Sequence, residues 1–415
     1  RADISKLPAW VGVDLGALFL IGQNNREQGV ARAYVNQYEP AMDVWLRLLK
    51  RLYELGEPQA VTLSTVPHGA PLAVVMSHDI DYTRSIVNAS AYAAFEASNA
   101  VPATYFIQTK YVRDWNDQVF FNALGVEHLR KVHGLGQEIA SHSVAHSQVF
   151  HRAELGSGQE QYPGYQPFVH DAQKTDGMSV LGELRVSRFL LTHFLPGYEV
   201  SSFRPGHLKD PYSLPQALEA TGYRYSSSVT ANNSLTHLPF RLTYGREGRS
   251  PLPVFEFPVT VEDEALPRLG ERVQPSLDLA RQLSTYGGLM MVLIHTDVMD
   301  HKLAFEKAFV AALKDKAWFG SLKMYGDFWA ARDAVRISAT EPNAAAWRLT
   351  LDAPMPLQGL TLTLPDQVRV KGVEPGALTW RQEGRKLILD AASGVVRIHL
   401  TTPPAAVPNV TRGNS

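Results

Sequence analysis

The sequence predicts an α/β fold, a (β/α) barrel followed by a small all-β sandwich domain, and three patterns carry this prediction. Short β-branched or aromatic runs alternate with amphipathic helices from about residue 72 to residue 335. Polar residues suited to chemistry come directly after several of the predicted strands. Beyond residues 337–339 the chain changes to short alternating strands separated by Pro, Gly and Asp. Repeated strand–helix units indicate a parallel sheet, either a barrel or a doubly wound sheet, and the polar residues at the strand ends favour barrel-like closure. Closely spaced alternating strands indicate a sandwich.

Length and composition narrow the possible classes of protein. A chain of 415 residues exceeds one ordinary hydrophobic core, so two or three domains are expected. Forty basic and 41 acidic residues nearly cancel, so the net charge favours neither nucleic acid nor an anionic membrane as a partner. No apolar run approaches the roughly 20 residues that span a bilayer. Because cysteine is absent, any metal must be held by His, Asp or Glu.

The start of the chain suggests where the protein works. It begins at Arg1, with neither an initiator Met nor a signal peptide. We therefore interpret it as a mature form or a fragment of a longer protein. Together with the lack of cysteine, this favours an exported bacterial protein, either periplasmic or extracellular, whose signal peptide is not part of the chain shown.

The first 70 residues are predicted to form a mixed segment that packs on the barrel. Within residues 38–55, apolar residues recur at helical spacing, and Gly56-Glu57-Pro58 ends the helix. The barrel domain is assigned to residues 71–337. Its predicted strands are 72–77, 103–108, 137–141, 200–203, 223–227, 254–259 and 288–295. The helices predicted between them include 87–98, 179–194, 214–221, 275–285 and 303–314.

Two regions fall outside this alternation. Residues 148–176 are rich in Gly, Pro, Gln and Tyr, and so long a loop is either functional, as a lid or substrate-binding loop, or an insertion without a role. Residues 338–402 are predicted to form an accessory β-sandwich with strands at 347–351, 360–364, 368–373, 386–389 and 395–400. Whether this module binds glycans is left open, because fold does not assign function. Residues 403–415 are predicted to be a flexible tail.

The residues with the clearest chemical meaning are two histidines and two aspartates. His142 and His146 are four residues apart, so a helix of about 3.6 residues per turn would place both on one face. Asp79 and Asp81 follow an apolar strand. Two His and one Asp with open coordination positions are typical of catalytic metal sites. Taken singly, the histidines could be surface residues, and an aspartate could cap a helix.

Six further segments follow in a fixed order. They are Val101-Pro102-Ala103-Thr104-Tyr105-Phe106, Gly136-Gln137-Glu138-Ile139-Ala140-Ser141-His142, Phe203-Arg204-Pro205-Gly206, Glu256-Phe257-Pro258-Val259-Thr260, Val292-Leu293-Ile294-His295-Thr296 and Tyr325-Gly326-Asp327-Phe328-Trp329. Over about residues 71–335, the set resembles the polysaccharide deacetylases of the NodB-homology type, the family-four carbohydrate esterases. The resemblance implies a distorted (β/α) barrel that removes acetyl groups from N-acetylated sugars of a polymer.

The resemblance also implies roles for individual residues. Asp81, His142 and His146 fall on the ligands of a divalent metal, zinc first, with cobalt or nickel as alternatives. Asp79 falls on the general base, His295 on the acid, and Arg204 on the arginine that steadies the base. The implied partners are a polysaccharide substrate and, as candidates, proteins that export an exopolysaccharide.

The chain departs from the family pattern at three points. Ile80 separates the two aspartates, which are adjacent in the family; residues two apart in an extended segment still face the same way, but the roles of base and ligand become open. Arg204 is followed by Pro205-Gly206-His207 instead of Pro-Pro-aromatic, so the backbone N–H of His207 would serve the oxyanion. The family's Asp–Trp motif, which orients the acid, has no counterpart. Together with the long insertion, these points indicate a divergent branch.

Each implied role has a structural alternative. His295 could be a buried core histidine and Arg204 an ordinary ion-pair donor, although both end strands on the side where barrel active sites lie. His78 is predicted to pack behind the site. For the whole chain, the leading hypothesis is a metal-dependent N-deacetylase of an N-acetylhexosamine exopolysaccharide. The alternatives are a catalytically inactive barrel that binds glycan, and a metal-dependent deacetylase of a small acetylated metabolite.

Overall fold

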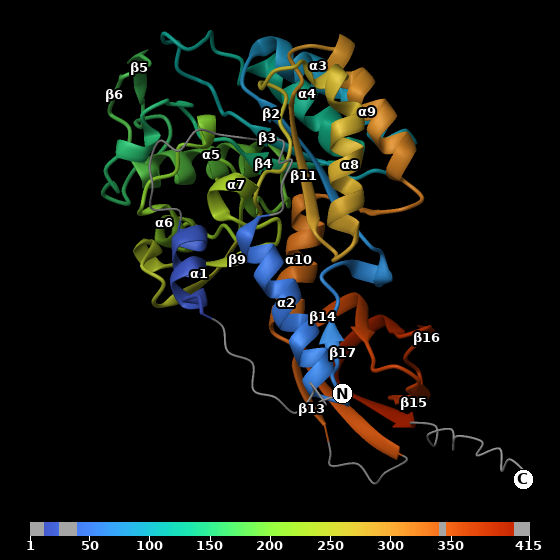
Figure 1. The fold of residues 1–415 in the computed structure, drawn as a ribbon. Helices are drawn as coiled ribbons and strands as arrows, with labels where there is room; N and C mark the ends of the chain where they lie inside the picture. The colour runs from blue at the N-terminus through green and yellow to red at the C-terminus, as the bar shows by residue number, and fades with distance from the viewer. Residues whose placement is uncertain (1–11, 25–39, 340–345, 402–415) are drawn as a thin grey trace, which may run out of the picture. The chain divides into compact units, whose positions relative to one another are not determined.

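The computed structural model describes residues 12–24, 40–339 and 346–401, and these form two compact units (Figure 1). The larger unit holds residues 12–24, 40–49 and 70–327, and the smaller holds the other described residues. The helix predicted at 38–55 is found as α2 (Ala41–Gly56), with residues 38 and 39 outside the described part of the chain. The predicted tail, 403–415, lies outside it as well. The predicted domain limits remain predictions.

The larger unit is built on one nine-stranded, mainly parallel sheet. Only the pair β9–β10 is antiparallel. In spatial order the strands are β11 (Leu289–His295), β2 (Ala73–Ile80), β3 (Thr104–Ile107), β4 (Glu138–Ser141), β7 (Ser202–Phe203), β8 (Tyr225–Ser226), β10 (Pro251–Glu256) and β9 (Phe240–Thr243), with β12 (Trp318–Phe319) also on β2. The predicted α/β class with a parallel sheet is confirmed, and each of the seven predicted strands is present.

The closed barrel predicted from the sequence is not found among the described strands. The ladder path starts at β11 and ends at β9, with no ladder between these two strands. A single parallel bridge, Val261 to Val292, joins the chain beyond β10 to β11. The sheet stays open on this side because the segment after β10 pairs with β11 through this isolated bridge and forms no ladder with it among the described residues.

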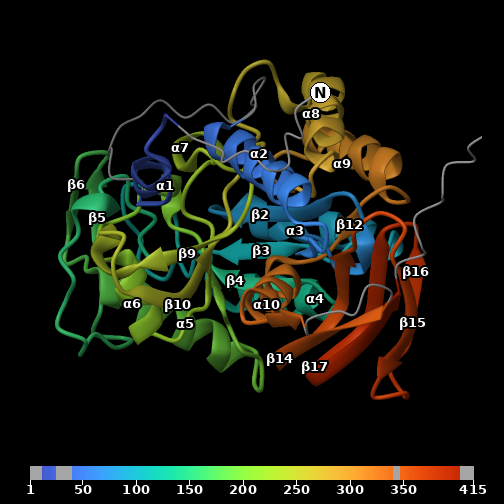
Figure 2. The same ribbon diagram turned by 60° about the horizontal axis from the view of Figure 1, so that its bottom comes forward.

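Helices cover the sheet, as Figures 1 and 2 show. They include α3 (Thr83–Ser98), α4 (Ala123–Gly134), α5 (Val180–Phe194), α6 (Leu214–Ala220), α8 (Val273–Ser284) and α9 (Asp300–Leu313). The remaining helices are α1 (Leu15–Asn24), α7 (Ala231–Ser234) and α10 (Leu322–Asp333). All eight residues of β2 are buried, as expected for a parallel strand that is covered on both faces. None of the described helices is both long and apolar enough to cross a membrane.

The register of the sheet brings the polar strand ends together. In the ladders, Asp79 lies opposite His295, Ile107 opposite Ser141, and Ser141 opposite Phe203. Because parallel strands end at the same edge, the residues that follow these positions meet at one place. The sheet therefore gathers residues that are far apart in sequence at its carboxyl edge.

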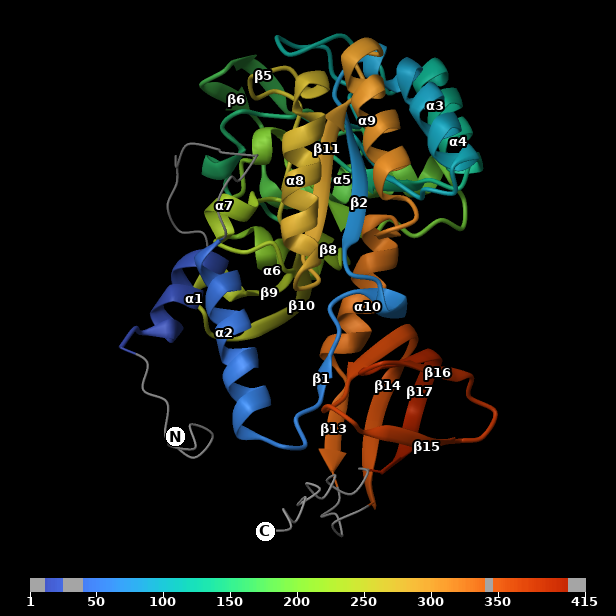
Figure 3. The same cartoon turned by 45° about the vertical axis from the view of Figure 1, so that its right-hand side comes forward.

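The smaller unit is a six-stranded antiparallel sheet (Figure 3). Its strands are β1 (Thr62–Leu63), β13 (Arg336–Ala339), β14 (Ala346–Thr363), β15 (Arg369–Glu374), β16 (Trp380–Glu383) and β17 (Lys386–Thr401). The prediction of separate strands at 347–351 and 360–364 is wrong, because both lie in β14. The prediction of separate strands at 386–389 and 395–400 is wrong as well, because both lie in β17. Pro354 and Pro356 had indicated a turn, but the strand continues past them through a register shift between Ala353 and Leu357, and bulges tolerate proline. The six-stranded sheet supports the predicted all-β domain in part, and a second, facing sheet of a sandwich is not found among the described strands of this unit.

Glu256, the last residue of β10, provides a test of this fold. Its Oε1 accepts hydrogen bonds from the backbone N–H groups of Ser228 (2.6 Å) and Val229 (3.1 Å), and the residue is buried. Burial raises the pKa of Glu256 from 4.5 to about 7. The folded state then holds this proton more tightly than the unfolded chain, so the free energy of unfolding contributed by Glu256 falls as the pH rises from about 4.5 to about 7.

We expect Glu256→Gln to remove this pH dependence, because the amide keeps the accepting oxygen and cannot ionise. At pH 8 the variant should exceed the wild type in unfolding free energy by about 1–3 kcal/mol. Urea denaturation at pH 5 and pH 8 measures the difference, with Glu219→Gln on the exposed face of α6 as the control. A variant that loses as much stability between these pH values as the wild type would contradict the assignment.

Candidate active site

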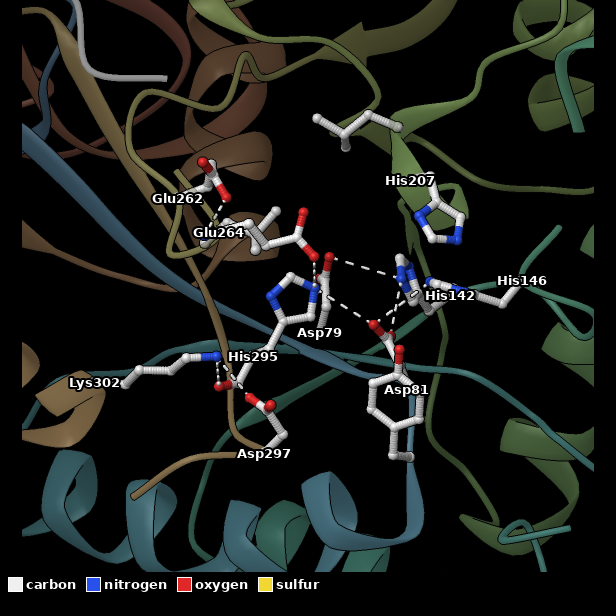
Figure 4. A pocket seen from close by; sticks show the side chains of 13 residues that line it. Asp79, Asp81, His142, His146, His207, Glu262, Glu264, His295, Asp297 and Lys302 are labelled. Atoms are coloured by element: carbon white, nitrogen blue, oxygen red, sulfur yellow. Dashed lines mark hydrogen bonds and ion pairs between the residues drawn. The ribbon is translucent and has the colours of Figure 1, made fainter. Parts of the chain in front are cut away.

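Asp79 and Asp81 stand at the carboxyl end of β2, on the same side of the chain (Figure 4). Asp79 contacts Arg204, as does Ser77 two residues earlier, whereas His78 contacts Glu96 of α3 on the other side. This alternation is that of an extended strand. The intervening Ile80 therefore leaves both carboxylates facing one cavity, as the sequence predicted.

His142 and His146 are brought together by a loop, and the helix considered for residues 142–146 is wrong. The segment after β4 is irregular, with Ser143 at φ 67° and His146 at φ 53°. Left-handed backbone costs a non-glycine residue about 1–2 kcal/mol, so tertiary contacts must hold it. The two imidazole centroids nevertheless lie 4.9 Å apart. The four-residue spacing correctly predicted that the two histidines are neighbours, but a loop and not a helix brings them together.

Asp81, His142 and His146 form a compact buried set of ligand atoms. Asp81 Oδ1 is 3.2 Å from His142 Nε2, and Asp81 Oδ2 is 3.5 Å from His146 Nε2. Ligands on one tetrahedral zinc, with bonds of about 2.0–2.1 Å, are spaced about 3.3 Å apart. Asp81 Oδ1 and His142 Nε2 are buried and have no hydrogen-bond partner among the described residues. The donor set therefore fits a divalent metal ion.

His142 can act as a metal ligand in its neutral form. Its Nδ1 lies 2.8 Å from the carbonyl oxygen of Arg204, so the proton of the neutral ring sits on Nδ1. In that form Nε2 presents a lone pair to a carboxylate oxygen of Asp81, and a cation between the two acceptors would satisfy both.

The charges of the three groups depend on one another. Burial by itself would raise the pKa of Asp81, but the imidazoles of His146, His142 and His295 hold it below its usual range. Burial lowers the pKa of His146 to about 4, which favours the neutral ring that a metal ligand needs. Burial would also lower the pKa of His142, but the carboxylates of Asp79 and Asp81 raise it. The anionic aspartate is thus the group that favours a cation.

Asp79 is held by a buried arginine. Arg204, the residue after β7, donates from Nη1 to Asp79 Oδ1 at 2.7 Å and is fully buried. Its Nη2 donates to the hydroxyls of Ser77 (3.0 Å) and Ser227 (2.9 Å). The guanidinium lies 4.1 Å from the centre of the Phe106 ring. While Arg204 holds Oδ1 of Asp79, the second oxygen, Oδ2, lies 3.7 Å from His142 Nε2.

Asp263 holds His295, and the sequence analysis missed this partner. Asp263 accepts from Nδ1 of His295 at 2.7 Å and from its backbone N–H at 2.9 Å. Lys302 Nζ lies 2.5 Å from Asp263. Nε2 of His295 therefore points into the cavity, 3.4 Å from Asp81 Oδ2. Burial would lower the pKa of His295, but the charge of Asp263 raises it well above its usual value.

A signal for Asp263 was present in the sequence. Glu262-Asp263 follows the apolar segment that continues Glu256-Phe257-Pro258, just as Asp79 ends an apolar strand. The family's Asp–Trp motif, which would supply the orienting carboxylate, was not located in the sequence. The carboxylate that orients the acid here comes instead from the chain that bridges to β11 at Val261.

His207 lies on the opposite wall of the cavity. It belongs to the short 3₁₀ turn Gly206–Leu208, and its ring centroid is 4.4 Å from that of His146. A Cβ on Gly206 would lie 2.5 Å from Cδ2 of His146, so only glycine fits there. Within Pro205-Gly206-His207, the glycine therefore leaves the space that the ring of His146 occupies.

These groups line one cavity of about 200 Å³ (Figure 4). Besides the residues above, its walls include Tyr82, Glu262, Glu264, Asp297 and Lys302. All the predicted site residues except Arg204 line it, and Arg204 lies buried behind Asp79. The structure thus brings the predicted residues together, although their individual roles remain predictions.

A second buried cluster lies on the other face of β2. His78 Nε2 is 2.7 Å from Glu96 Oε1 and 3.8 Å from Glu306 Oε2. The shorter distance is that of a hydrogen bond and is less than the spacing of two ligands on one ion. We interpret this cluster as packing that fixes β2 from behind.

The comparisons with known proteins give structural likenesses only. No family model matches the sequence, and no curated protein matches it. Among solved structures, the chain is similar to a protein of Mycobacterium smegmatis assigned as a polysaccharide deacetylase, with 15% identity, a TM-score of 0.49 and coverage of 68% of this chain and 100% of that one.

Two further similar structures are hydrolases of different substrates. The PuuE allantoinase has 12% identity and a TM-score of 0.43, with 63% of this chain and 91% of that chain covered. The chitin deacetylase of the fungal pathogen Colletotrichum lindemuthianum has 12% identity and a TM-score of 0.37, with 63% and 89% covered. At these identities the chemistry has to be argued from the side chains of the site itself.

Proposed function

We propose that this chain is a metal-dependent deacetylase that removes N-acetyl groups from an N-acetylhexosamine polymer. The observation that carries the proposal is the convergence of a buried Asp–His–His set, an arginine-held carboxylate and an aspartate-held imidazole on one cavity. In metal-assisted hydrolysis of an amide, a cation polarises the carbonyl, a base takes the proton of water and an acid protonates the departing amine, and these groups could supply all three.

Asp81, His142 and His146 would hold the ion. When bound, a divalent ion polarises a carbonyl group and lowers the pKa of water to about 7. Zinc suits a site of two imidazoles and one carboxylate, and cobalt or nickel are the alternatives. Buried Asp81 supplies the negative charge, and the contact from Nδ1 of His142 to Arg204 fixes the ring that would bind.

Asp79 and His295 divide the proton transfers between them. Asp79, held through one oxygen by Arg204, keeps its other oxygen toward the cavity, where it can take the proton of the attacking water. His295 would deliver a proton from Nε2 to the departing amine, because Asp263 accepts from its Nδ1. The backbone N–H of His207 remains our candidate for a donor to the developing oxyanion.

The polymer substrate rests on the sequence motifs. Six segments in family order resemble the polysaccharide deacetylases of the NodB-homology type. From the split acidic pair and the insertion at 148–176, we propose a divergent branch, the deacetylase portion of the bacterial Pel exopolysaccharide modification protein. On this reading, residues 71–337 form the catalytic domain and 338–402 an accessory domain. The protein would act in the periplasm or outside the cell, with exopolysaccharide export proteins as candidate partners.

Two other functions are distinguishable from this one. A catalytically inactive barrel would bind the polymer without turnover, but it would not need a base, an acid and their buried orienting partners together. A deacetylase of a small metabolite would use the same groups on a different substrate. The choice between polymer and metabolite therefore depends on the substrate tested.

The first test measures acetate release from polymers of N-acetylglucosamine and of N-acetylgalactosamine. We expect release from one polymer, its loss on chelation, and recovery on adding zinc, cobalt or nickel, because the cation would activate the amide. Release that is indifferent to chelation would contradict the metal role. Binding of polymer without acetate release would support the inactive barrel, and release only from small acetylated sugars would support the metabolite enzyme.

The second test separates base from ligand with two isosteric variants. We expect Asp79→Asn to lower kcat by about 10²–10⁴-fold, because an amide cannot take the proton of the attacking water. The variant should still bind one metal ion, since the partner of the Asp79 carboxylate is Arg204. Asp81→Asn should instead weaken metal binding, since this residue contacts both histidines. Kinetics and metal titration measure both effects, with the exposed Asp278→Asn of α8 as the control. The reverse pattern would show that the two roles are exchanged.

A further inference from the structure

The loop that carries His142 and His146 is held by groups from outside itself. The carbonyl of Ser143 accepts from the backbone N–H of Thr109 at 3.0 Å, and that of Val144 accepts from the side chain of Gln108 at 3.0 Å. Asn116 Nδ2 donates to the carbonyls of Ala145 (3.1 Å) and His146 (2.9 Å). A buried backbone in left-handed conformations persists only where such contacts fix it.

Two N–H groups in the middle of this loop, those of Val144 and Ala145, are bound by one carboxylate, that of Glu183 in α5. Its Oε2 accepts from the backbone N–H of Val144 at 2.7 Å and of Ala145 at 2.8 Å. Glu183 is 1% exposed, and both donors are buried as well. Hydrogen bonds to an ionised acceptor are among the stronger ones, and losing it would leave two buried N–H groups without a partner.

The other oxygen of Glu183 is held by the insertion at 148–176. The hydroxyl of Tyr165 donates to Glu183 Oε1 at 2.8 Å and accepts from the backbone N–H of Ser179 at 3.1 Å. Tyr165 is 6% exposed, and its ring lies against Gly182 of α5. A Cβ on Gly182 would approach the ring to 2.2 Å, so α5 has a glycine where the tyrosine passes.

A second connection runs from the insertion to Asn116. The backbone N–H of Trp115 donates to the carbonyl of Val169 in β5 (Phe168–Asp171) at 3.1 Å. Asp114, paired with Lys110 at 2.5 Å in the interior, accepts from the N–H groups of Val169 and Asn116. The insertion thus contacts both sets of groups that hold the histidine loop.

We propose that the insertion at 148–176 acts as a strut that positions the metal ligands, with Tyr165 and Glu183 as positioning residues. Tyr165 fixes Glu183, Glu183 fixes the peptide groups of Val144 and Ala145, and these set the position of His146. This inference rests on the proposed metal site and adds that its affinity depends on the insertion. Residues that orient metal ligands typically change affinity by about 10–100-fold.

The test compares Tyr165→Phe with Tyr162→Phe, a half-exposed tyrosine of the same insertion. The titrant is Zn²⁺ alone, in competition with a chromophoric chelator. We expect Tyr165→Phe to weaken zinc binding about 3–10-fold, and Glu183→Gln about 10–100-fold, with Tyr162→Phe unchanged. The visible spectrum of bound Co²⁺ should change in the first two variants, because the ligand geometry shifts.

Thermal melting of the metal-free proteins separates positioning from general stability. Gly182→Ala, which displaces the Tyr165 ring, should reproduce the loss of affinity in a folded protein. Unchanged zinc affinity and an unchanged Co²⁺ spectrum in folded Tyr165→Phe and Glu183→Gln would overturn the proposal. Absence of acetate release by the wild type, with the affinity losses present, would overturn the proposed function and leave the strut standing.

Discussion

Two buried polar atoms that face each other in one cavity underlie the proposed metal site. Asp81 Oδ1 and His142 Nε2 lie 3.2 Å apart, and neither has a hydrogen-bond partner among the described residues. Leaving buried polar groups unpaired is costly, at about 1–3 kcal/mol each and more for a charged group. A cation relieves both at once, and His146 completes the set from the far end of the same loop. The rest of the site is arranged around this requirement.

The parallel sheet supplies the arrangement. Asp79 and His295 are opposite one another in the β2–β11 ladder. The proposed base, Asp79, and the proposed acid, His295, therefore both lie beside the proposed ion. Each is then fixed by one buried partner of opposite charge character, Arg204 for Asp79 and Asp263 for His295. Buried ion pairs of this kind contribute little to net stability, but removing one partner leaves an uncompensated charge. We therefore infer that these two ion pairs serve mainly to fix the positions of Asp79 and His295.

The sequence predicts those parts of the structure that depend on local pattern. The apolar runs located seven of the nine strands of the mainly parallel sheet but neither β9 nor the two-residue β12. The polar residues after the strands located the cavity, because strand ends share an edge. Tertiary effects account for the failures. The loop between His142 and His146 is held by Glu183, which accepts from Val144 and Ala145, and by Asn116, which donates to His146. No periodicity of the sequence indicates these contacts. Pro354 and Pro356 indicated a turn in the sequence, but a bulge accommodates both prolines within β14.

Asp263 shows the limit of reasoning by motif. The carboxylate that orients the acid was expected from a particular pattern, and the chain supplies it from a segment that matches no strand or helix. Likewise, the segment 148–176 lacked periodicity, which left open a lid, a substrate-binding loop or an insertion without a role. In the structure its buried Tyr165 donates to Glu183, which accepts from two N–H groups of the histidine loop. Both cases depend on long-range contacts of single side chains, which become visible only when the chain is folded.

The central claim is that one divalent ion binds between Asp81, His142 and His146. The most direct measurement is anomalous X-ray scattering from a crystal grown with zinc, with data collected on both sides of the zinc edge. The account requires one strong anomalous peak at about 2.0–2.2 Å from the imidazole Nε2 atoms and the Asp81 carboxylate. A crystal without a peak there, or with its peak at the His78–Glu96–Glu306 cluster alone, would contradict it.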